Sequence, residues 1–107
     1  MITEKSKDSL SFIESITGKK LTLGSFLLAI RQGEDESQVA FAKILGISRQ
    51  NLCDIEHGRK FISPKMAAEY ADKLGYSKKQ FVRLCLQDLL DRDGLSLVVE
   101  VDNIAQN

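Results

Sequence analysis

The sequence predicts an all-α fold: a compact bundle of five short helices, with an N-terminal helical extension and a short C-terminal β-strand. Apolar residues recur at helical spacing over most of the chain. A serine or threonine stands where each core helix would begin, and a glycine stands where each would end. With 107 residues, of which 43% are hydrophobic and 28% charged, the chain has the size and composition of one small globular domain.

The same composition limits the classes of function. No apolar run is long enough to span a bilayer and the N-terminus lacks a signal-peptide pattern, so we expect a cytoplasmic protein without membrane contact. Two distant cysteines and one histidine make neither a zinc site nor a disulfide framework, and we expect no metal and no cofactor. No catalytic motif is recognisable, which argues against an enzyme. Cys85 is expected in the core and Cys53 on the surface, where a redox role is an open alternative.

Three parts follow one another: an extension over residues 1–20, a helical domain over 21–92 and a tail over 93–107. The extension is expected to hold a short amphipathic helix, because three of its apolar residues share one helical face: Leu10, Ile13 and Ile16. That helix would pack on the domain or fray. The alternative is a basic arm or a partner-binding helix.

Capping patterns define three helices of the domain outside its centre. The expected segments, each from its capping residue to its terminal glycine, are 22–33, 63–75 and 77–94. The second of them has proline at its first helical position, where a missing N–H costs nothing. Leu21 and Phe26 are placed to form a hydrophobic staple at the start of the first.

The central stretch from Ser37 to Gly58 predicts two short helices joined by a tight turn. The first runs from residue 38 to about 45 and ends at Gly46, and the second begins after Ser48 and runs to about His57. The residues expected to be buried where the helices cross are Phe41, Ala42, Ile44, Leu45, Ile47, Leu52 and Ile55.

The exposed side of the second helix carries groups that can read DNA bases. Arg49 offers a bidentate match to guanine and Gln50 a bidentate match to adenine. Asp54, one turn further, can accept from cytosine but repels phosphates. This pattern is typical of a DNA-binding helix-turn-helix, whose second helix enters the major groove by its N-terminal end.

The stretch resembles the Xre/Cro family of phage-repressor-like regulators. The resemblance spans about residues 21–90 and is carried by the spacing of Gln38, Ala42, Gly46, Ile47-Ser48, Leu52, Ile55-Glu56 and Gly58-Arg59. It implies a repressor-like bundle in which Arg31 pairs with Glu56. This pair would clamp the first core helix to the second helix of the helix-turn-helix, which is the expected reading helix. The sequence departs from the family at Glu36, where a leucine is common.

The resemblance also implies contacts to the DNA backbone. Gln38, Ser48 and Asn51 match positions that hold the sugar-phosphate chain, and His57 matches a position that often touches it. The alternative for His57 is a helix-terminal residue favoured by the helix dipole. Arg59 and Lys60 follow the reading helix directly and fit phosphate contacts, although a solvated charge pair is an equal alternative.

Charge is unevenly distributed although the net charge is zero. The segment from Lys43 to Lys65 contains five basic residues and two acidic ones, a net charge of +3. From Asp88 to Asp102 five acidic residues face one basic one, a net charge of −4. The helix-turn-helix is therefore the end suited to phosphates.

The tail changes period, because apolar residues alternate at Leu95, Leu97, Val99 and Val101. A single strand cannot satisfy its backbone within a helical bundle, so we expect a partner strand from a second copy or from another protein. The alternative is a strand lying flat on its own bundle.

These observations favour a sequence-specific transcriptional regulator, most often a repressor in this family, which binds a palindromic operator in double-stranded DNA as a homodimer. The alternative is the antitoxin of a toxin–antitoxin pair, which would bind a toxin protein through its added segment and repress its own promoter. The acidic tail would suit a basic toxin.

Overall fold

The computed structural model describes residues 2–4 and 21–104. Along these residues the chain forms five helices and two short strands. They are β1 (Ile2–Glu4), α2 (Leu23–Gly33), α3 (Gln38–Leu45), α4 (Arg49–Glu56), α5 (Pro64–Leu74), α6 (Lys78–Arg92) and β2 (Leu97–Val99). The predicted helical bundle with a C-terminal strand is confirmed. Within the described ranges, no helix combines the length and apolarity that crossing a bilayer requires.

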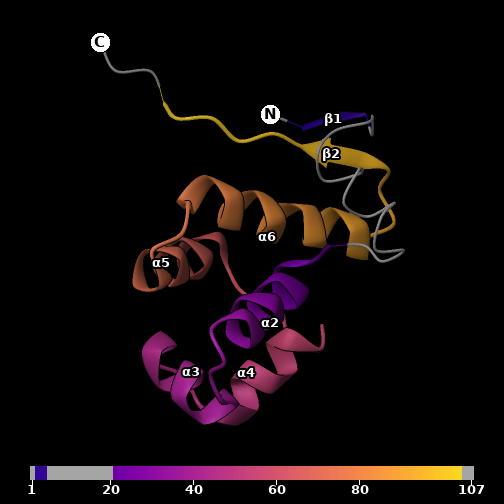
Figure 1. Cartoon of the computed structure of the whole chain (residues 1–107). Coiled ribbons are helices and arrows are strands. Elements are labelled where there is room, and N and C mark those ends of the chain that lie inside the picture. The colour runs from indigo at the N-terminus through magenta and orange to yellow at the C-terminus, as the bar shows by residue number, and fades with distance from the viewer. Residues whose placement is uncertain (1, 5–20, 105–107) are drawn as a thin grey trace.

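The helices form two groups that meet at α2. Figure 1 shows α2 in the centre, α3 and α4 on one side of it, and α5 and α6 on the other. The two strands lie beyond α6, at the end of the molecule opposite α3 and α4. The helix-turn-helix and the C-terminal tail therefore occupy opposite ends.

Each helix begins at a serine or threonine whose hydroxyl oxygen accepts a hydrogen bond from a backbone N–H three residues on. The capping residues are Thr22, Ser37, Ser48, Ser63 and Ser77. At Thr22 the bond is reciprocal, because the Ser25 hydroxyl accepts from the Thr22 N–H at 2.9 Å. This capping box was not expected, since serine stands where glutamate or glutamine is usual.

The helix ends differ slightly from the predicted ones. Gly46 and Gly75 adopt left-handed conformations with φ of 76°, as a terminal glycine allows. Gly33 instead stays within α2, and the left-handed residue of the following loop is Asp35, with φ of 57°. Aspartate tolerates this conformation because its short polar side chain can hydrogen-bond locally. His57, predicted as the last residue of the reading helix, is its C-cap.

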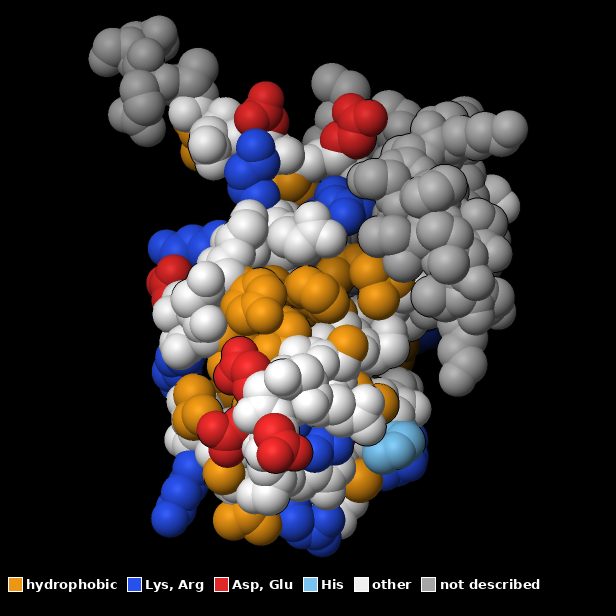
Figure 2. Space-filling view, in the orientation of Figure 1, with side chains coloured by type: hydrophobic (Ala, Val, Ile, Leu, Met, Phe, Trp, Pro, Cys, Tyr) orange, Lys and Arg blue, Asp and Glu red, His pale blue; other side chains and the backbone are white. Residues whose placement is uncertain are grey.

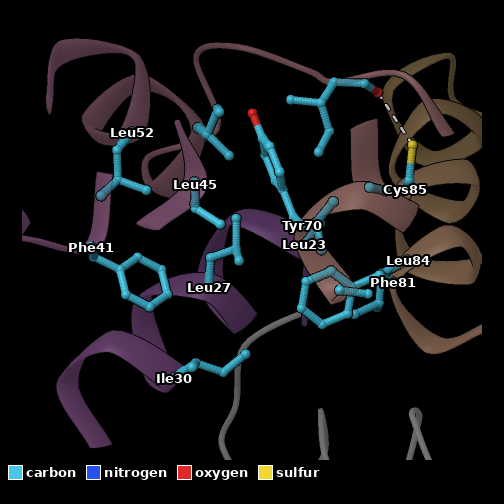
Figure 3. Packing of buried hydrophobic residues seen from close by; sticks show 14 of the residues in the cluster. Leu23, Leu27, Ile30, Phe41, Leu45, Leu52, Tyr70, Phe81, Leu84 and Cys85 are labelled. Atoms are coloured by element: carbon cyan, nitrogen blue, oxygen red, sulfur yellow. Dashed lines mark hydrogen bonds between the residues drawn. The ribbon is translucent and has the colours of Figure 1, made fainter. Parts of the chain in front are cut away.

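One hydrophobic cluster joins both groups of helices. Figure 3 shows Leu27 of α2 between Phe41 and Leu45 on one side and Phe81 and Leu84 on the other. Burial of each such side chain contributes about 1.5–3 kcal/mol. Ile44, predicted to be buried, is 43% exposed, because the side of α3 that faces the core is occupied by its neighbours in the sequence.

Two backbones approach closely where α2 crosses α4. A Cβ atom built at Gly24 would lie 2.0 Å from the carbonyl oxygen of Ile55, so no larger residue fits there without moving a helix. Behind this crossing, the buried thiol of Cys85 donates to the carbonyl oxygen of Ile62 at 3.2 Å (Figure 3). The prediction that Cys85 is a core residue is correct.

The C-terminal strand finds its partners within the chain. β2 pairs antiparallel with β1, and Thr3 stands opposite Val98. The other edge of β2 is held by the buried amide of Gln87, which donates to the Leu97 carbonyl at 2.8 Å and accepts from the Val99 N–H at 2.9 Å. The partner expected from outside the chain is thus not needed over residues 97–99. The strand is also shorter than predicted, because its pairing ends there.

Burial in β2 does not follow the predicted single apolar face. Val98 and Val99 are both buried although neighbouring strand residues point to opposite faces, and Leu95 is 47% exposed. The strand is therefore covered on both faces. β1 lies in the part predicted as a helical extension, and the helix expected around Leu10, Ile13 and Ile16 falls outside the described residues.

Candidate nucleic-acid interface

The turn between α3 and α4 is fixed from two sides. The backbone N–H of Ile47 donates to the Ala42 carbonyl at 3.0 Å, which closes the turn around Gly46. From α5, the ammonium group of Lys73 donates to the carbonyl of Leu45, the last residue of α3, at 3.0 Å. A cation is favourable at this position because unpaired carbonyls give a helix C-terminus negative partial charge. The angle between the two helices is therefore held by the backbone and by α5.

Beneath α4, Arg31 of α2 and Glu56 of α4 form an ion pair. The Nε atom of Arg31 lies 2.8 Å from one carboxylate oxygen of Glu56, and a terminal guanidinium nitrogen lies 3.3 Å from the other. Arg31 also donates to the carbonyl of Glu36 at 3.0 Å. Glu36 thus contributes its backbone carbonyl to this clamp.

Gln38 connects the clamp to the exposed side of α4. Its Nε2 atom donates to Glu56 at 2.9 Å, and its Oε1 atom accepts from the Arg49 guanidinium at 3.3 Å. A carboxylate only accepts and a guanidinium only donates, so the orientation of the Gln38 amide is unambiguous. Arg49, an exposed residue, is thereby linked to the buried ion pair while guanidinium donors remain for a ligand.

Further along α4, Gln50, Asp54 and Arg59 form a second connected group. Asp54 Oδ1 accepts from Gln50 Nε2 at 3.1 Å and from Arg59 Nε at 3.0 Å. The hydrogen bond and charge of Arg59, with the bond from Gln50, hold the pKa of the Asp54 carboxyl below its ordinary value. The negative charge predicted to repel phosphates is therefore matched by a neighbouring cation.

The residues predicted to contact the DNA backbone differ in their exposure and in their hydrogen-bond partners. Ser48 uses its hydroxyl oxygen to cap α4, accepting from the Asn51 N–H at 3.0 Å, and keeps its own O–H for donation. Asn51 Oδ1 accepts from the Lys60 ammonium at 3.1 Å. Ser48 and Lys60 are exposed and Asn51 is half-buried, so all three lie at the surface around the N-terminal half of α4.

His57 lies at the far end of α4 with its ring turned to the helix. Its Nδ1 atom is 2.8 Å from the carbonyl oxygen of Cys53, which can only accept, so this nitrogen carries a proton. Because Nδ1 is engaged in this bond, Nε2 is the ring nitrogen that remains for a ligand. Cys53 is half-buried and lies 3.6 Å from His57 and 3.4 Å from Arg59. Across residues 2–4 and 21–104, no group of three or more potential metal ligands comes together.

Apart from the pair of Arg31 and Glu56, the side-chain contacts of this site were not predicted from the sequence. The bond between Gln50 and Asp54 follows the i, i+4 spacing of helical side-chain pairs and could have been found that way. The bond from Gln38 to Glu56 and the bond from Lys73 to α3 join segments that are distant in the sequence, and no local sequence pattern predicts them.

Charged groups of both signs surround the interface. Figure 2 shows Lys, Arg, Asp and Glu side chains intermixed at the end of the molecule formed by α3 and α4, whereas hydrophobic side chains gather between α2 and α6. The acidic loop over residues 34–36 leads directly into α3. The positive excess between Lys43 and Lys65 does not come from α4 itself, where Arg49 is outnumbered by Asp54 and Glu56. It comes from Lys43 of α3 and from the basic residues after α4, which are Arg59, Lys60 and Lys65.

A separate cavity of about 380 Å³ opens between the N-terminus of α2 and α6. Its lining includes Leu23, Phe61, Asp88 and Arg92. Asp88 accepts from the Leu23 N–H at 3.0 Å, and the Arg92 guanidinium lies 5.1 Å from the centre of the Phe61 ring. The lining also includes Lys60, a predicted phosphate contact, but none of the predicted base readers.

Comparisons of the chain with protein-family models, curated proteins and solved structures gave no match. The resemblance to the Xre/Cro regulators therefore rests on the residues and spacings quoted above. What the geometry adds is a short helix with polar side chains on its outer face and a scaffold that fixes its position.

Proposed function

We propose that the protein is a sequence-specific DNA-binding transcriptional regulator of the cytoplasm, acting as a repressor, with α4 as the helix that enters the major groove. The single observation that carries this proposal is the two-sided character of α4. Leu52, Ile55 and Glu56 are buried, while Arg49 and Gln50 are exposed at its N-terminal end. Such a helix is held by its inner side and is free to present donors and acceptors to base edges.

The connections behind α4 support the same role. Arg49 is linked through Gln38 to the buried pair of Arg31 and Glu56, so a base-reading guanidinium is oriented before DNA arrives. A side chain fixed in this way loses less conformational entropy on binding. We assign the phosphate contacts to the exposed Arg59, Lys60 and His57, and to Ser48 and Asn51.

A homodimer on a palindromic operator is part of the proposal. One reading helix makes too few contacts for specific affinity, whereas a two-fold dimer reads two half-sites about one helical turn apart. Gln87 and β1 already occupy β2 over residues 97–99. A partner strand would therefore add beyond Val99, along residues 100–104, where Val101 is half-buried and Ile104 is 86% exposed.

A second candidate function, the antitoxin of a toxin–antitoxin pair, is favoured by the same tail. Residues 100–104 follow β2 without further secondary structure, and the acidic residues among them are Glu100 and Asp102. They lie at the end opposite α3 and α4 (Figure 1), so a basic protein could bind there while α4 contacts DNA. The two functions are compatible.

The experiment is a gel-shift titration of the gene's own upstream region and of a scrambled duplex. Two chains are compared, the full chain and one ending at Val99, which keeps β2. We expect the full chain to bind the upstream region at least tenfold more tightly than the scrambled duplex. Equal affinity for both duplexes would refute sequence-specific regulation at this site. If the chain ending at Val99 no longer forms the complex of two chains with the duplex, the tail is the dimer contact. If a basic protein co-purifies with the full chain and not with the truncated chain, the tail has the antitoxin role.

A further inference from the structure

The group formed by Gln50, Asp54 and Arg59 determines which side of the Gln50 amide faces outward. An ionised carboxylate accepts hydrogen bonds and donates none. The contact of 3.1 Å between Gln50 and Asp54 Oδ1 must therefore be made by the Gln50 NH₂ group. The carbonyl oxygen of Gln50 is on the other side of the amide and remains an acceptor for a ligand.

Asp54 is itself held in place. Arg59 donates to its Oδ1 atom through Nε at 3.0 Å, and the Arg59 backbone N–H donates to the Asp54 carbonyl at 2.8 Å. A glutamine–aspartate pair at i, i+4 alone contributes only about 0.2–0.5 kcal/mol and would not fix an exposed amide. The charge-assisted bond from Arg59 is stronger and keeps the carboxylate where Gln50 meets it.

The four bases differ at the position that an outward carbonyl would meet. In the major groove adenine presents its N6 amino group and cytosine its N4 amino group, both donors. Guanine and thymine present the O6 and O4 acceptors at the corresponding place, which a carbonyl oxygen repels. A free glutamine could rotate its amide to suit either set, but rotation here would point its carbonyl oxygen at Asp54.

We propose that Asp54 is a positioning residue that restricts Gln50 to bases that present an amino group in the major groove, adenine or cytosine, at one position of each operator half-site. This inference rests on the proposed DNA-binding function and names the bases that it reads. It also changes the predicted role of Asp54, which acts through Gln50 and Arg59 instead of contacting a base.

The test is selection of bound duplexes from a randomised library, with sequencing of the bound fraction, using the full chain. Gln50→Ala identifies the position that Gln50 reads. Asp54→Asn is nearly isosteric, but an asparagine amide both donates and accepts, so Gln50 becomes free to rotate. Asp72→Asn is the matched control, because Asp72 pairs with Lys78 away from α4 and loses the same charge.

We expect the unaltered chain and Asp72→Asn to prefer adenine or cytosine at that position by roughly tenfold over guanine or thymine. Asp54→Asn should reduce this preference at least threefold and leave the preferences at other positions unchanged. An unchanged preference in Asp54→Asn, a preference for guanine or thymine in the unaltered chain, or no effect of Gln50→Ala would each overturn the inference alone. Absence of any sequence preference in the unaltered chain would overturn the proposed function as well.

Discussion

Arg31 and Glu56 join α2 to α4 through two hydrogen bonds, of 2.8 and 3.3 Å, between a guanidinium and a carboxylate. The side chain of Glu56 is completely enclosed, and that of Arg31 is 15% exposed. The buried carboxylate accepts a third bond from Gln38 at 2.9 Å. Its charge is therefore stable inside the protein only while its cationic partner is present.

Replacing Arg31 with methionine should lower the free energy of unfolding by about 3–5 kcal/mol, because it leaves a buried charge without its counterion. The measurement is urea denaturation followed by circular dichroism. Lys78→Met is the control, since it breaks an exposed pair with Asp72 and should cost less than about 1 kcal/mol. Equal losses of unfolding free energy in the two variants would show that the pair of Arg31 and Glu56 stabilises the fold no more than an exposed ion pair does.

The sequence predicted the helices well because the relevant signals are local. Each helix begins with a hydroxyl residue that caps its own first turn, and Gly46 ends α3 in the conformation that only glycine adopts easily. The ion pair of Arg31 and Glu56 is different, because 25 residues separate its members. Only the resemblance to a known family placed them together.

Replacing Arg49 with alanine should relax the preference for one base pair and cost on the order of 1–3 kcal/mol of binding free energy on the selected operator. The reason is the loss of the guanidinium donors that Gln38 orients towards the exposed side of α4. The measurement is a comparison of dissociation constants on the operator and on duplexes altered at single positions. Equal weakening on all duplexes would show that Arg49 contacts phosphate and reads no base.

Replacing Arg59 with alanine should lower the slope of log affinity against log salt concentration by about one unit, because one phosphate contact is lost. The same change leaves the negative charge of Asp54 without its cationic partner, and this charge repels phosphate. The loss of affinity at low salt should therefore exceed the loss caused by removing one neutral contact. Fluorescence titrations between low and moderate salt give the slope. Lys78→Ala removes one cation on the opposite group of helices and should leave the slope unchanged. An unaltered slope in Arg59→Ala would remove Arg59 from the phosphate contacts.

Replacing Gln87 with leucine should loosen β2, because the Leu97 carbonyl and the buried Val99 N–H lose their partner on α6. An unpaired buried backbone group costs about 1–3 kcal/mol. Amide hydrogen exchange at Val99 should accelerate by at least tenfold, while exchange at Leu27 in the core changes little. Gln87→Glu keeps the acceptor for Val99 and should have a smaller effect on exchange there. Unchanged exchange in the leucine variant would mean that β1 alone holds the strand.

The strand also shows what the sequence could not reveal. Alternation of Leu95, Leu97, Val99 and Val101 indicated a strand but suggested a longer one with a single buried face. The pairing with β1 joins the two ends of the chain, and the contact with Gln87 uses a side-chain amide in place of a strand. Neither has a periodic signature, so neither could be derived from spacing. The same holds for the orientation of Gln50, which depends on the position of Arg59 after the helix has ended.

Stability should fall above pH 9 because of Cys85. Burial, with a smaller contribution from the charge of Asp88, raises the pKa of this thiol from 9.0 to about 11. Between these values the unfolded chain releases the thiol proton while the folded chain retains it. The stabilisation is therefore complete below pH 9 and is lost progressively towards pH 11. The loss should reach at most about 3 kcal/mol over this range.

Urea denaturation of reduced protein from pH 7 to pH 11 measures this loss of stability, and Cys85→Ala should show a shallower decline. Tyr70, whose pKa burial also raises, is present in both chains and does not affect the difference between them. Parallel declines in the two proteins would show that the Cys85 thiol ionises equally in the folded and unfolded states.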